Sequence, residues 1–579
     1  MRTILATLHS KFIHNSLALP CLAAYCGDTC GELLIREFTV HEPREAILAM
    51  LLAEQPDVVA FSVYLWNRRE TLDLIDALAV AQPGLRLVVG GPEVSFEGPA
   101  LFARHPGLTA VVRGEGEEPL RALLSAWTTG KQPGEISRLT LRRDEEIASG
   151  PDGPPLARLD DIPSPFENGL IDCERGFVYY ETSRGCPFRC SFCLSANDDR
   201  VRSYSMARIE SDLRWLLERG VPKIKLVDRT FNYDAARARE IFTFILAHNR
   251  TSHLHFEIAA HLLDAPTFTL LEQVPAGMFQ FEIGVQSTLQ QTLTAIDRRV
   301  CLDALAESVR RLRRAGRITL HLDLVAGLPG EGYSDFLTSI DRVAALAPHH
   351  LQIEPVKLLP GTPLRRQAAR HAIRFDPNPP YTILGSSDLD FGELQRIRET
   401  SRLLDLIWNS GNMQTFVQVL AEGFGSLAKG LEHLANYWRQ HDLFRFPSSR
   451  QALFEQCGRF ATRQDEAWHG RLRDALAYDY ARCERVVLSR LPEFFDVNLE
   501  LAEQAWVRRQ VEARTEAIRG AGIKLQHFAA VFHHLPDHPE RTVRLFCYLT
   551  ETGRGMTVEE FVCPQLSTTG TITGSDPHG

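Results

Sequence analysis

The sequence has 579 residues, of which 44% are hydrophobic and 24% charged, and its formal net charge is −9. This length predicts three or four domains of roughly 150 residues each, and the mixed, slightly acidic charge gives no footprint for DNA. No apolar run reaches the roughly 18 residues that cross a bilayer, and no signal peptide follows Met1. We therefore expect a cytoplasmic protein with no membrane partner, in which twelve cysteines serve as thiols and metal ligands.

Residues 1–130 alternate short apolar strands with amphipathic helices. The expected strands lie at 2–7, 32–38, 58–64, 86–89 and 109–112. This alternation predicts a doubly wound α/β domain with a parallel sheet covered by helices on both faces.

Ligands bind such sheets at the carboxyl ends of the strands. The candidate binding residues at those ends are Ser62, Trp66, Gly90, Gly91, Glu93 and Gly114. The glycines suit plain turns between strand and helix equally well, so both interpretations stay open. No G-x-G-x-x-G motif follows the first strand, which disfavours a dinucleotide.

Residues 131–175 are rich in Pro, Gly and Asp, which predicts a linker without secondary structure. A metal-binding pattern follows directly. Cys186, Cys190 and Cys193 form a C-x3-C-x2-C motif after an extended run and a glycine turn. Three thiolates within eight residues can hold three irons of a 4Fe–4S cluster and leave the fourth iron open to an outside ligand.

A structural zinc site is the alternative for these cysteines. Zinc prefers four protein ligands in a closed tetrahedron. The fourth ligand would then come from Cys173 or from a distant histidine. We favour the iron–sulfur interpretation because of the strands that follow.

Residues 176–370 alternate strands and helices again. Strands are expected before Cys186 and at 223–227, 255–259, 279–285, 319–325 and 351–358. Six strand–helix units predict a partial (β/α)6 barrel, whose chemistry lies at the carboxyl ends of its strands. Polar residues such as Asp228, Glu257, Glu282 and Gln286 lie on or after these strands, although each taken alone also suits a buried hydrogen bond.

Residues 371–566 read as a mostly helical C-terminal domain, with apolar helical spacing at 394–408, 413–421, 424–437 and 474–488. A strand is possible at 543–548. Residues 567–579 are polar and are predicted to be a disordered tail.

Two parts of the sequence resemble a known family. The cysteine motif is similar to the signature of radical S-adenosylmethionine (SAM) enzymes. The runs Gly-Val-Gln-Ser, Asp-Leu-Val-Ala-Gly-Leu-Pro-Gly-Glu and Pro-Gly-Thr-Pro-Leu resemble strand motifs of radical SAM barrels such as oxygen-independent coproporphyrinogen oxidase. Residues 1–130 resemble the cobalamin-binding domain that precedes the barrel in one group of these enzymes. As a whole, the chain resembles cobalamin-binding-domain radical SAM proteins with an additional C-terminal domain of unassigned role.

The resemblance implies cofactors and residue roles. The open iron of the cluster would chelate SAM, Asp228 would meet the SAM amino group, Glu282 and Gln286 would lie near its ribose, and Gly327 would lie near its adenine. The Gly-Gly-Glu run common after the second strand of this superfamily is absent. The Asp-x-His-x-x-Gly motif that ligates cobalt is absent too, and His9, His14 and His41 lack its spacing. If cobalamin binds, no histidine is expected beneath the cobalt.

The leading hypothesis is a cobalamin-dependent radical SAM methyltransferase acting on an unactivated carbon of a small molecule or a peptide. The expected electron donor is a flavodoxin or a ferredoxin. A second hypothesis is cobalamin-assisted oxidation or cyclisation, as in anaerobic tetrapyrrole cyclisation, and a third is a zinc or iron–sulfur protein without turnover. A tRNA-modifying role has no basic segment to support it. The sequence leaves open the substrate, the residues that take part in catalysis and the oligomeric state.

Overall fold

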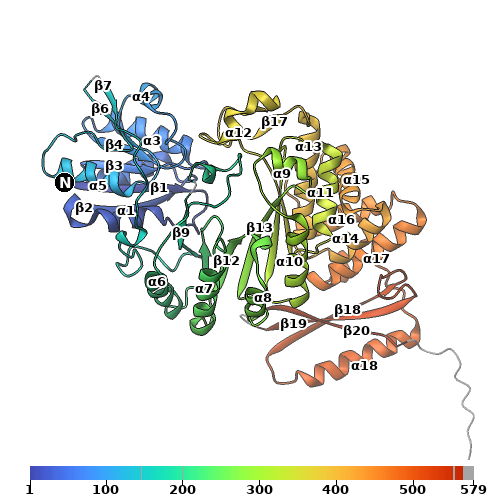
Figure 1. Ribbon diagram of the computed structural model, residues 1–579. Helices are drawn as coiled ribbons and strands as arrows, with labels where there is room; N and C mark the ends of the chain where they lie inside the picture. Colours follow the sequence, from blue (N-terminus) through green and yellow to red (C-terminus); the bar gives the residue numbers. More distant parts are fainter. Residues whose placement is uncertain (145, 199, 552–553, 565–579) are drawn as a thin grey trace, which may run out of the picture. The chain divides into compact units, whose positions relative to one another are not determined.

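The computed structural model describes residues 1–144, 146–198, 200–551 and 554–564. The chain forms two compact units, Met1–Leu394 and Gln395–Gly579 (Figure 1). The predicted tail at 567–579 lies outside the described residues, and the predicted domain boundaries at 130, 175 and 370 stay predictions.

The first unit begins with a seven-stranded sheet in the order β2-β1-β3-β4-β5-β6-β7. Its first five strands are parallel and confirm the predicted ones. Their bounds are β1 (Arg2–His9), β2 (Glu32–Thr39), β3 (Val58–Ser62), β4 (Arg86–Gly90) and β5 (Leu108–Val112).

Helices cover both faces of this sheet, as the sequence predicts. One apolar core packs the sheet against α2 (Arg44–Ala53), α3 (Arg68–Ala81) and α4 (Pro99–Arg104). The other packs it against α1 (Ala18–Cys26) and α5 (Glu117–Thr128). The doubly wound prediction is therefore confirmed.

The expected linker is wrong in part. Within 131–175 the chain forms β6 (Leu139–Arg143), which pairs antiparallel with β5, and β7 (Glu146–Ser149), which pairs antiparallel with β6. Leu139 and Leu141 alternate with polar residues and add to the core beneath α5. Five residues of alternation are hard to recognise between segments rich in proline and glycine.

The second sheet has the order β15-β14-β13-β12-β11-β8, and all its strands are parallel. The strands are β8 (Val178–Tyr180), β11 (Lys223–Leu226), β12 (His253–Ile258), β13 (Phe279–Gln286), β14 (Thr319–Ala326) and β15 (His350–Pro355). The helices around it are α6 (Met206–Glu218), α7 (Ala235–His248), α8 (Ala265–Leu271), α9 (Gln290–Ala295), α10 (Leu302–Ala315) and α11 (Tyr333–Ala344). Six parallel strands in sequential order confirm the partial barrel.

A short segment completes this unit after the barrel. It contains α12 (Pro363–Arg366) and the strand pair β16 (Arg374–Phe375) and β17 (Ile383–Gly385). Helix α13 (Phe391–Leu404) then leads into the second unit.

The second unit is mostly helical, as expected, but it ends in a sheet. Its helices are α14 (Gln414–Phe424), α15 (Leu427–Gln440), α16 (Arg450–Ala461), α17 (Glu466–Cys483) and α18 (Leu501–Ala517). The sheet is antiparallel and consists of β18 (Ile523–Phe532), β19 (Thr542–Glu551) and β20 (Arg554–Val562). The possible strand at 543–548 lies within β19, whereas its two neighbours were not predicted.

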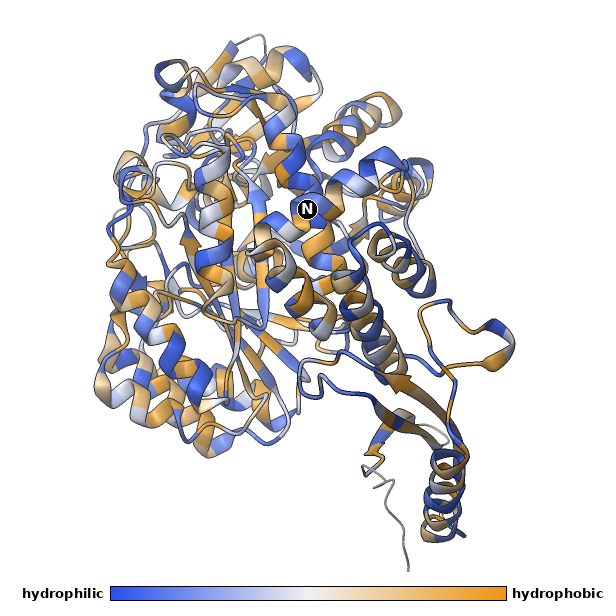
Figure 2. Cartoon of the chain, turned by 90° about the vertical axis from the view of Figure 1, so that its right-hand side faces the viewer, coloured by the Kyte–Doolittle hydropathy of each residue, from blue (hydrophilic) through white to orange (hydrophobic). Residues whose placement is uncertain are grey.

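The helices throughout the chain mix hydrophilic and hydrophobic residues (Figure 2). Among the described residues, no helix is both long enough and apolar enough to cross a membrane.

Candidate functional site

The cysteine motif lies on a loop that leaves the carboxyl end of β8. Strand β9 (Ser183–Arg184) pairs antiparallel with β10 (Arg202–Ser203) and closes this loop at its base. Gly185 has φ +92, and a Cβ there would lie 2.1 Å from the carbonyl oxygen of Arg200. Only glycine therefore allows the two arms of the loop to approach so closely.

The loop is also held against the barrel. The backbone N–H of Ser191 donates to Ile296 O at 2.8 Å, and Ser191 O accepts from the N–H of Leu364 at 2.8 Å. These contacts attach the motif to the segments that follow α9 and β15. The cysteines thus lie at the carboxyl ends of the strands, where the sequence places them.

Each thiol has a polar neighbour. Cys186 Sγ lies 3.5 Å from Thr230 Oγ1, and Arg298 donates to Cys190 Sγ at 3.4 Å. Cys193 Sγ accepts from the N–H of Ser195 at 3.4 Å. The first two thiols are buried, whereas the third is half-buried. Donors directed at sulfur stabilise thiolates and tune a metal centre that they hold.

The donor set suits a thiolate-bound cluster. The three sulfurs are close enough that negative charge on Cys193 and Cys186 adds to burial in raising the pKa of Cys190, while Arg298 lowers it. Across the described ranges, no three His, Cys, Asp or Glu side chains are already arranged to hold a metal ion. Three soft thiols from one loop nevertheless match iron–sulfur ligation, with one position left for another ligand.

The barrel interior is polar and is not packed shut. Along β13, Phe279, Phe281, Ile283 and Val285 are buried, whereas the residues between them are partly exposed. Phe279 and Phe281 stack against Phe242 of α7, so the alternate side chains face inward. A barrel that needed only stability would fill this space with branched apolar residues. A lumen lined with partly exposed polar groups instead suits a polar ligand.

Several inward residues carry charge or can do so. They include Lys225, His255, Glu257, Glu282, His321 and Asp323. His255 Nε2 lies 2.9 Å from Glu282 Oε2, and this hydrogen bond lowers the pKa of Glu282. Burial, together with the negative charge of Glu282, raises the pKa of Glu257 to about 7 and that of Asp323 to about 8. The Oδ1 atom of Asp323 is buried and accepts no hydrogen bond within the described part of the chain.

These raised pKa values predict a pH-dependent stability. The folded chain holds the Asp323 proton more tightly than the unfolded chain, in which a carboxyl pKa lies near 4. Stability that is present below pH ~4 is therefore lost as the pH rises through about 8. We expect Asp323→Asn to stabilise the cofactor-free protein by roughly 1–2 kcal/mol at about pH 8.5 and by little at about pH 4.5.

Urea unfolding at both pH values, followed by circular dichroism, measures this difference. Asp303→Asn, which removes an exposed carboxyl group on α10, is the control and should change both values alike. An Asp323→Asn variant with the same gain at both pH values would contradict the assignment.

Asp228 is placed differently from the expectation. Its side chain is fully buried and accepts hydrogen bonds from Thr182 N at 3.2 Å, Thr182 Oγ1 at 2.5 Å and Ser183 Oγ. Arg237 lies 4.0 Å away. A carboxylate with these partners has little capacity left for a ligand. Asp228 therefore fixes the segment before the cysteine loop, and the predicted contact with the SAM amino group does not fit this geometry.

The other barrel candidates fall into two groups. Glu282 faces the lumen with 29% of its side chain exposed, and Gln286 ends the same strand with φ +73. Both remain available to a ligand. Gly327 is buried, and a Cβ there would lie 2.9 Å from the Ile383 side chain, so β17 covers the turn expected near adenine.

The sheet of the first domain presents an aromatic pair at its carboxyl edge. Tyr64 and Trp66 follow β3 and stack with ring centroids 4.7 Å apart. The indole N–H of Trp66 donates to Leu8 O at 3.1 Å, yet 49% of the residue is exposed. Phe12, in the loop after β1, is 72% exposed. Exposed aromatic surface at a sheet edge suits a large planar ligand.

The glycine turns beside this pair form a cradle. Gly91 has φ +107, and a Cβ there would lie 2.6 Å from Val63 O. Ser95 Oγ donates to Gly91 O at 2.8 Å and accepts from Gly114 N–H at 3.0 Å, which joins the turns after β4 and β5. Gly90 ends β4, and Ser62 is buried and donates to Thr7 Oγ1 at 3.0 Å. Ser62 therefore holds the ends of β3 and β1 together beneath the cradle and does not face it.

Glu93 does not face this cradle. It is 2% exposed and accepts a hydrogen bond from the Tyr381 hydroxyl at 2.8 Å. Arg68 donates to its backbone oxygen. The expected role in cobalamin binding does not fit this position. Glu93 instead joins the first domain to the segment that follows the barrel.

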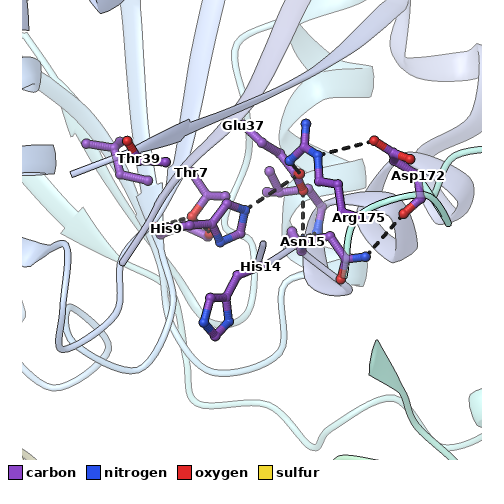
Figure 3. Close-up of polar contacts among 12 residues, drawn as sticks. Thr7, His9, His14, Asn15, Glu37, Thr39, Asp172 and Arg175 are labelled. Carbon is purple, nitrogen blue, oxygen red and sulfur yellow. Dashed lines mark hydrogen bonds and ion pairs between the residues drawn. The ribbon is translucent and has the colours of Figure 1, made fainter. Parts of the chain in front are cut away.

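Histidines near the cradle have other partners (Figure 3). His9 is buried and points toward Glu37, with Nε2 3.6 Å from Glu37 Oε2, and Arg175 donates to the same carboxylate at 2.7 Å. His14 points away from them and contacts the Tyr179 hydroxyl through Nδ1 at 3.0 Å. His9 and His14 thus contact side chains of β2 and β8, and the absence of a histidine beneath a bound cobalt stays a prediction.

An ion-pair network links the domain of the seven-stranded sheet, β1 to β7, to the cysteine loop. We call this domain the cradle domain. Arg184, two residues before Cys186, pairs with Glu117 at 2.8 Å and with Glu181 at 3.0 Å. Arg202, at the other end of the loop, pairs with Glu115. Both ends of the cysteine loop are thus tied to α5 and to the turn before it.

Three family models match the chain. Residues 3–124 match the B12 binding domain, residues 180–343 match the radical SAM superfamily, and residues 369–527 match a family described as a protein of unknown function, DUF4080. The first two matches coincide with the cradle domain and with most of the barrel.

Two curated relatives and one solved structure extend these matches. The chain is 28% identical over 426 residues to the cobalamin-dependent radical SAM methyltransferase TokK of Streptomyces tokunonensis, covering 67% of this chain and 61% of TokK. It is 25% identical over 338 residues to the anaerobic magnesium-protoporphyrin IX monomethyl ester cyclase of Cereibacter sphaeroides. This match covers 53% of this chain and 54% of the cyclase. The solved structure is the cobalamin-dependent SAM radical enzyme OxsB with aqua-cobalamin and SAM bound, with a TM-score of 0.58 and 17% identity, covering 90% of this chain and 81% of OxsB.

The chain thus spans about three fifths of the length of the first curated relatives it matches. The OxsB likeness shows that the fold is shared. The domain content rests on the two family matches, which lie in the order B12-binding domain and then radical SAM domain. The chain thus combines a match to the B12 binding domain with a match to the radical SAM superfamily, as the cobalamin-binding-domain radical SAM proteins do.

Proposed function

We propose that this protein is a radical SAM enzyme with a 4Fe–4S cluster and cobalamin, and that it transfers a methyl group to an unactivated carbon of a small molecule or peptide. One observation carries the proposal. A three-thiol loop at the mouth of a polar barrel is tied by Arg184 and Arg202 to a domain whose sheet edge offers an aromatic pair and a glycine cradle.

In this proposal Cys186, Cys190 and Cys193 hold the cluster. When bound, the cluster supplies the electron that cleaves SAM to a 5′-deoxyadenosyl radical, and cobalamin carries the methyl group. Arg298 stabilises the Cys190 thiolate, because it places a donor beside the sulfur. The Thr230 hydroxyl, which donates to Arg229 O, contacts Cys186 Sγ. Asp228 keeps the start of the loop in place through Thr182 and Ser183.

The lumen residues bind and orient SAM. SAM has ribose hydroxyls, an ammonium group and a sulfonium centre, all of which favour carboxylate neighbours. Asp323 offers a buried oxygen without a partner, and Glu257 and Gln286 lie at or near the mouth on neighbouring strands. Glu282 lies beside Glu257 in the register of the two strands, but it is paired with His255, so its oxygens are less available than the ribose prediction assumed.

Cobalamin is proposed to lie against the Tyr64–Trp66 pair, above Gly91 and Gly114. His9 points toward Glu37, so it would not be directed at a cobalamin held in the cradle. An unligated lower face changes the reactivity of the cobalt, because axial ligands tune a cofactor's electronics.

A second candidate is cobalamin-assisted oxidation or cyclisation without net methylation. The similarity to the magnesium-protoporphyrin cyclase favours it, but that similarity covers less of the chain than the TokK similarity does. A non-catalytic zinc protein is the candidate of another class. Transfer of label from methyl-labelled SAM into product separates the first two, and formation of 5′-deoxyadenosine disfavours the third.

The proposed reaction needs a one-electron reductant, for which a flavodoxin or a ferredoxin is suited. A reducing cytoplasm fits the free thiols that the cluster requires, since all twelve cysteines are unpaired.

Cofactor analysis is the first test. Protein reconstituted anaerobically with iron, sulfide and hydroxocobalamin is desalted, and its iron, sulfide and zinc contents and visible spectrum are measured. About four irons and one cobalamin per chain are expected. Iron without cobalamin would contradict the proposed methyl transfer, and zinc in place of iron would contradict the radical mechanism.

A further inference from the structure

Arginines near the junction of the two domains of the first unit are paired with carboxylates. Arg184 and Arg202 bind glutamates on or before α5, Arg175 binds Glu37, and Arg68 pairs with Glu97. The pairs of Arg184 and Arg202 join the two domains, whereas the Arg68–Glu97 pair lies within the first domain, and in each pair the arginine charge is neutralised. Arg229 differs from them. It is exposed, and within the described ranges its guanidinium makes no ion pair or hydrogen bond with the protein.

Arg229 directly follows the carboxyl end of β11. Asp228 on one side is buried in its contacts with Thr182 and Ser183, and Thr230 on the other contacts Cys186 Sγ. Both neighbours are thus fixed beside the cysteine loop. The position of Arg229 at the mouth of the barrel is therefore well defined, although its own side chain has no partner.

The charge of Arg229 acts on both sides of the junction. Burial raises the pKa of Tyr64 and the pKa of Glu257, and the positive charge of Arg229 opposes both shifts. The Arg229 charge thus reaches both the aromatic pair of the cradle domain and the lumen of the barrel. Glu257 faces Arg229 but is only partly ionised near neutral pH, since its pKa is about 7. Arg229 therefore has no full counter-charge.

Lys225, four residues earlier on the same strand, does not share this situation. It is surrounded by Glu257, Glu282 and Asp323, whose pKa values its charge lowers. Of these three, Glu282 has a lowered pKa, so a full negative charge lies near this ammonium at neutral pH. Unlike the four paired arginines, Arg229 at the mouth has no ion pair within the part of the chain that the structure describes.

We propose that Arg229 binds an anionic oxygen group of the substrate, a carboxylate or a phosphate, and so places the substrate between the cradle and the cysteine loop. The proposal rests on the proposed function and names the substrate class for that site. A guanidinium forms paired hydrogen bonds with either group, which fixes orientation as well as charge. The reacting carbon would then lie in the space that SAM and cobalamin both reach.

The test is calorimetric titration of the full, anaerobically reconstituted protein with two probes, orthophosphate and acetate, in a low-salt zwitterionic buffer. We expect one probe to bind with a stoichiometry of one and to bind at least about tenfold more weakly to Arg229→Gln. Tighter binding of orthophosphate indicates a phosphate-bearing substrate, and tighter binding of acetate a carboxylate-bearing one. Arg229→Lys should bind with intermediate affinity, because it keeps the charge but not the paired donors.

Arg219→Gln is the matched control. Its guanidinium stacks on Trp215 at 3.8 Å on the outer surface of α6, so this variant removes the same charge away from the mouth. Circular dichroism melts establish that all variants are folded. The proposal is overturned if neither probe binds, if Arg229→Gln binds like the wild type, or if Arg219→Gln weakens binding equally.

Failure of this inference is distinguishable from failure of the proposed function. Wild-type protein from the same preparation is assayed for reductive formation of 5′-deoxyadenosine from SAM. Absence of the product from cluster-loaded protein overturns the proposed function. Formation of the product together with probe binding that ignores Arg229 overturns the inference alone.

Discussion

Replacing Cys190 by alanine is expected to abolish cluster assembly and SAM cleavage. Two thiols from the loop leave a second iron without a protein ligand, and a cluster held by two cysteines is not retained. We expect Cys190→Ala to retain little iron and sulfide after desalting and to lose more than about 100-fold in 5′-deoxyadenosine formation. Iron and sulfide analysis and chromatography of the SAM products measure both effects.

Cys301→Ala is the control, since Cys301 is exposed at the start of α10 and distant in sequence from the motif. It should retain both cluster and cleavage. The folded state of Cys190→Ala must also be checked by its melting curve, because Cys190 is buried. A folded Cys190→Ala protein with full iron content and full activity would show that the cluster is held elsewhere.

Replacing Gly91 by alanine is expected to release cobalamin and to destabilise the first domain. An alanine at φ +107 costs about 1–2 kcal/mol in backbone strain. Its Cβ would also lie 2.6 Å from Val63 O, so the turn after β4 or the end of β3 must shift. That shift adds about 1–3 kcal/mol and moves the cradle beside Tyr64 and Trp66. We expect a total loss of about 3 kcal/mol and little retained cobalamin.

Gly130→Ala separates strain from the clash. Gly130 has φ +68, and no atom lies within 4 Å of the position that an alanine Cβ would take, so this variant should lose only about 1 kcal/mol and keep cobalamin. Urea unfolding gives the stabilities, and visible absorbance after desalting gives the retained cobalamin. Equal losses in the two variants would mean that the approach of Gly91 to Val63 has no bearing on the cofactor.

The local pattern of the sequence was sufficient for the two parallel sheets. The period of apolar residues is carried within each strand and helix, and strands such as β13 and β14 alternate inward polar and outward apolar residues without a break. The position of the cysteine loop at the carboxyl ends of the barrel strands could also be predicted, because the motif directly follows a strand. The hairpin of β6 and β7 was missed because its apolar signal, chiefly Leu139 and Leu141, is too short.

The roles of individual polar residues depended on partners far away in the sequence. Asp228 meets Thr182 and Ser183, which lie about 45 residues earlier, and Glu93 meets Tyr381, 288 residues later. Neither pairing leaves a local signal, so both residues resembled ligand contacts. Thr230 and Arg298, which contact the thiols, were not singled out for the same reason. A lone threonine or arginine after a strand has no distinctive pattern.

The hydrogen bond between Glu93 and Tyr381 limits how this protein can be recombined with its relatives. A graft that brought in a foreign B12-binding domain but kept the native segment after the barrel would leave Tyr381 facing an unmatched surface. One that kept Glu93 without Tyr381 would bury a carboxyl group beside a missing donor. Exchangeable modules therefore do not coincide with the visible domains. The cradle domain and residues 356–385 should therefore be exchanged together, although the whole barrel separates them along the chain.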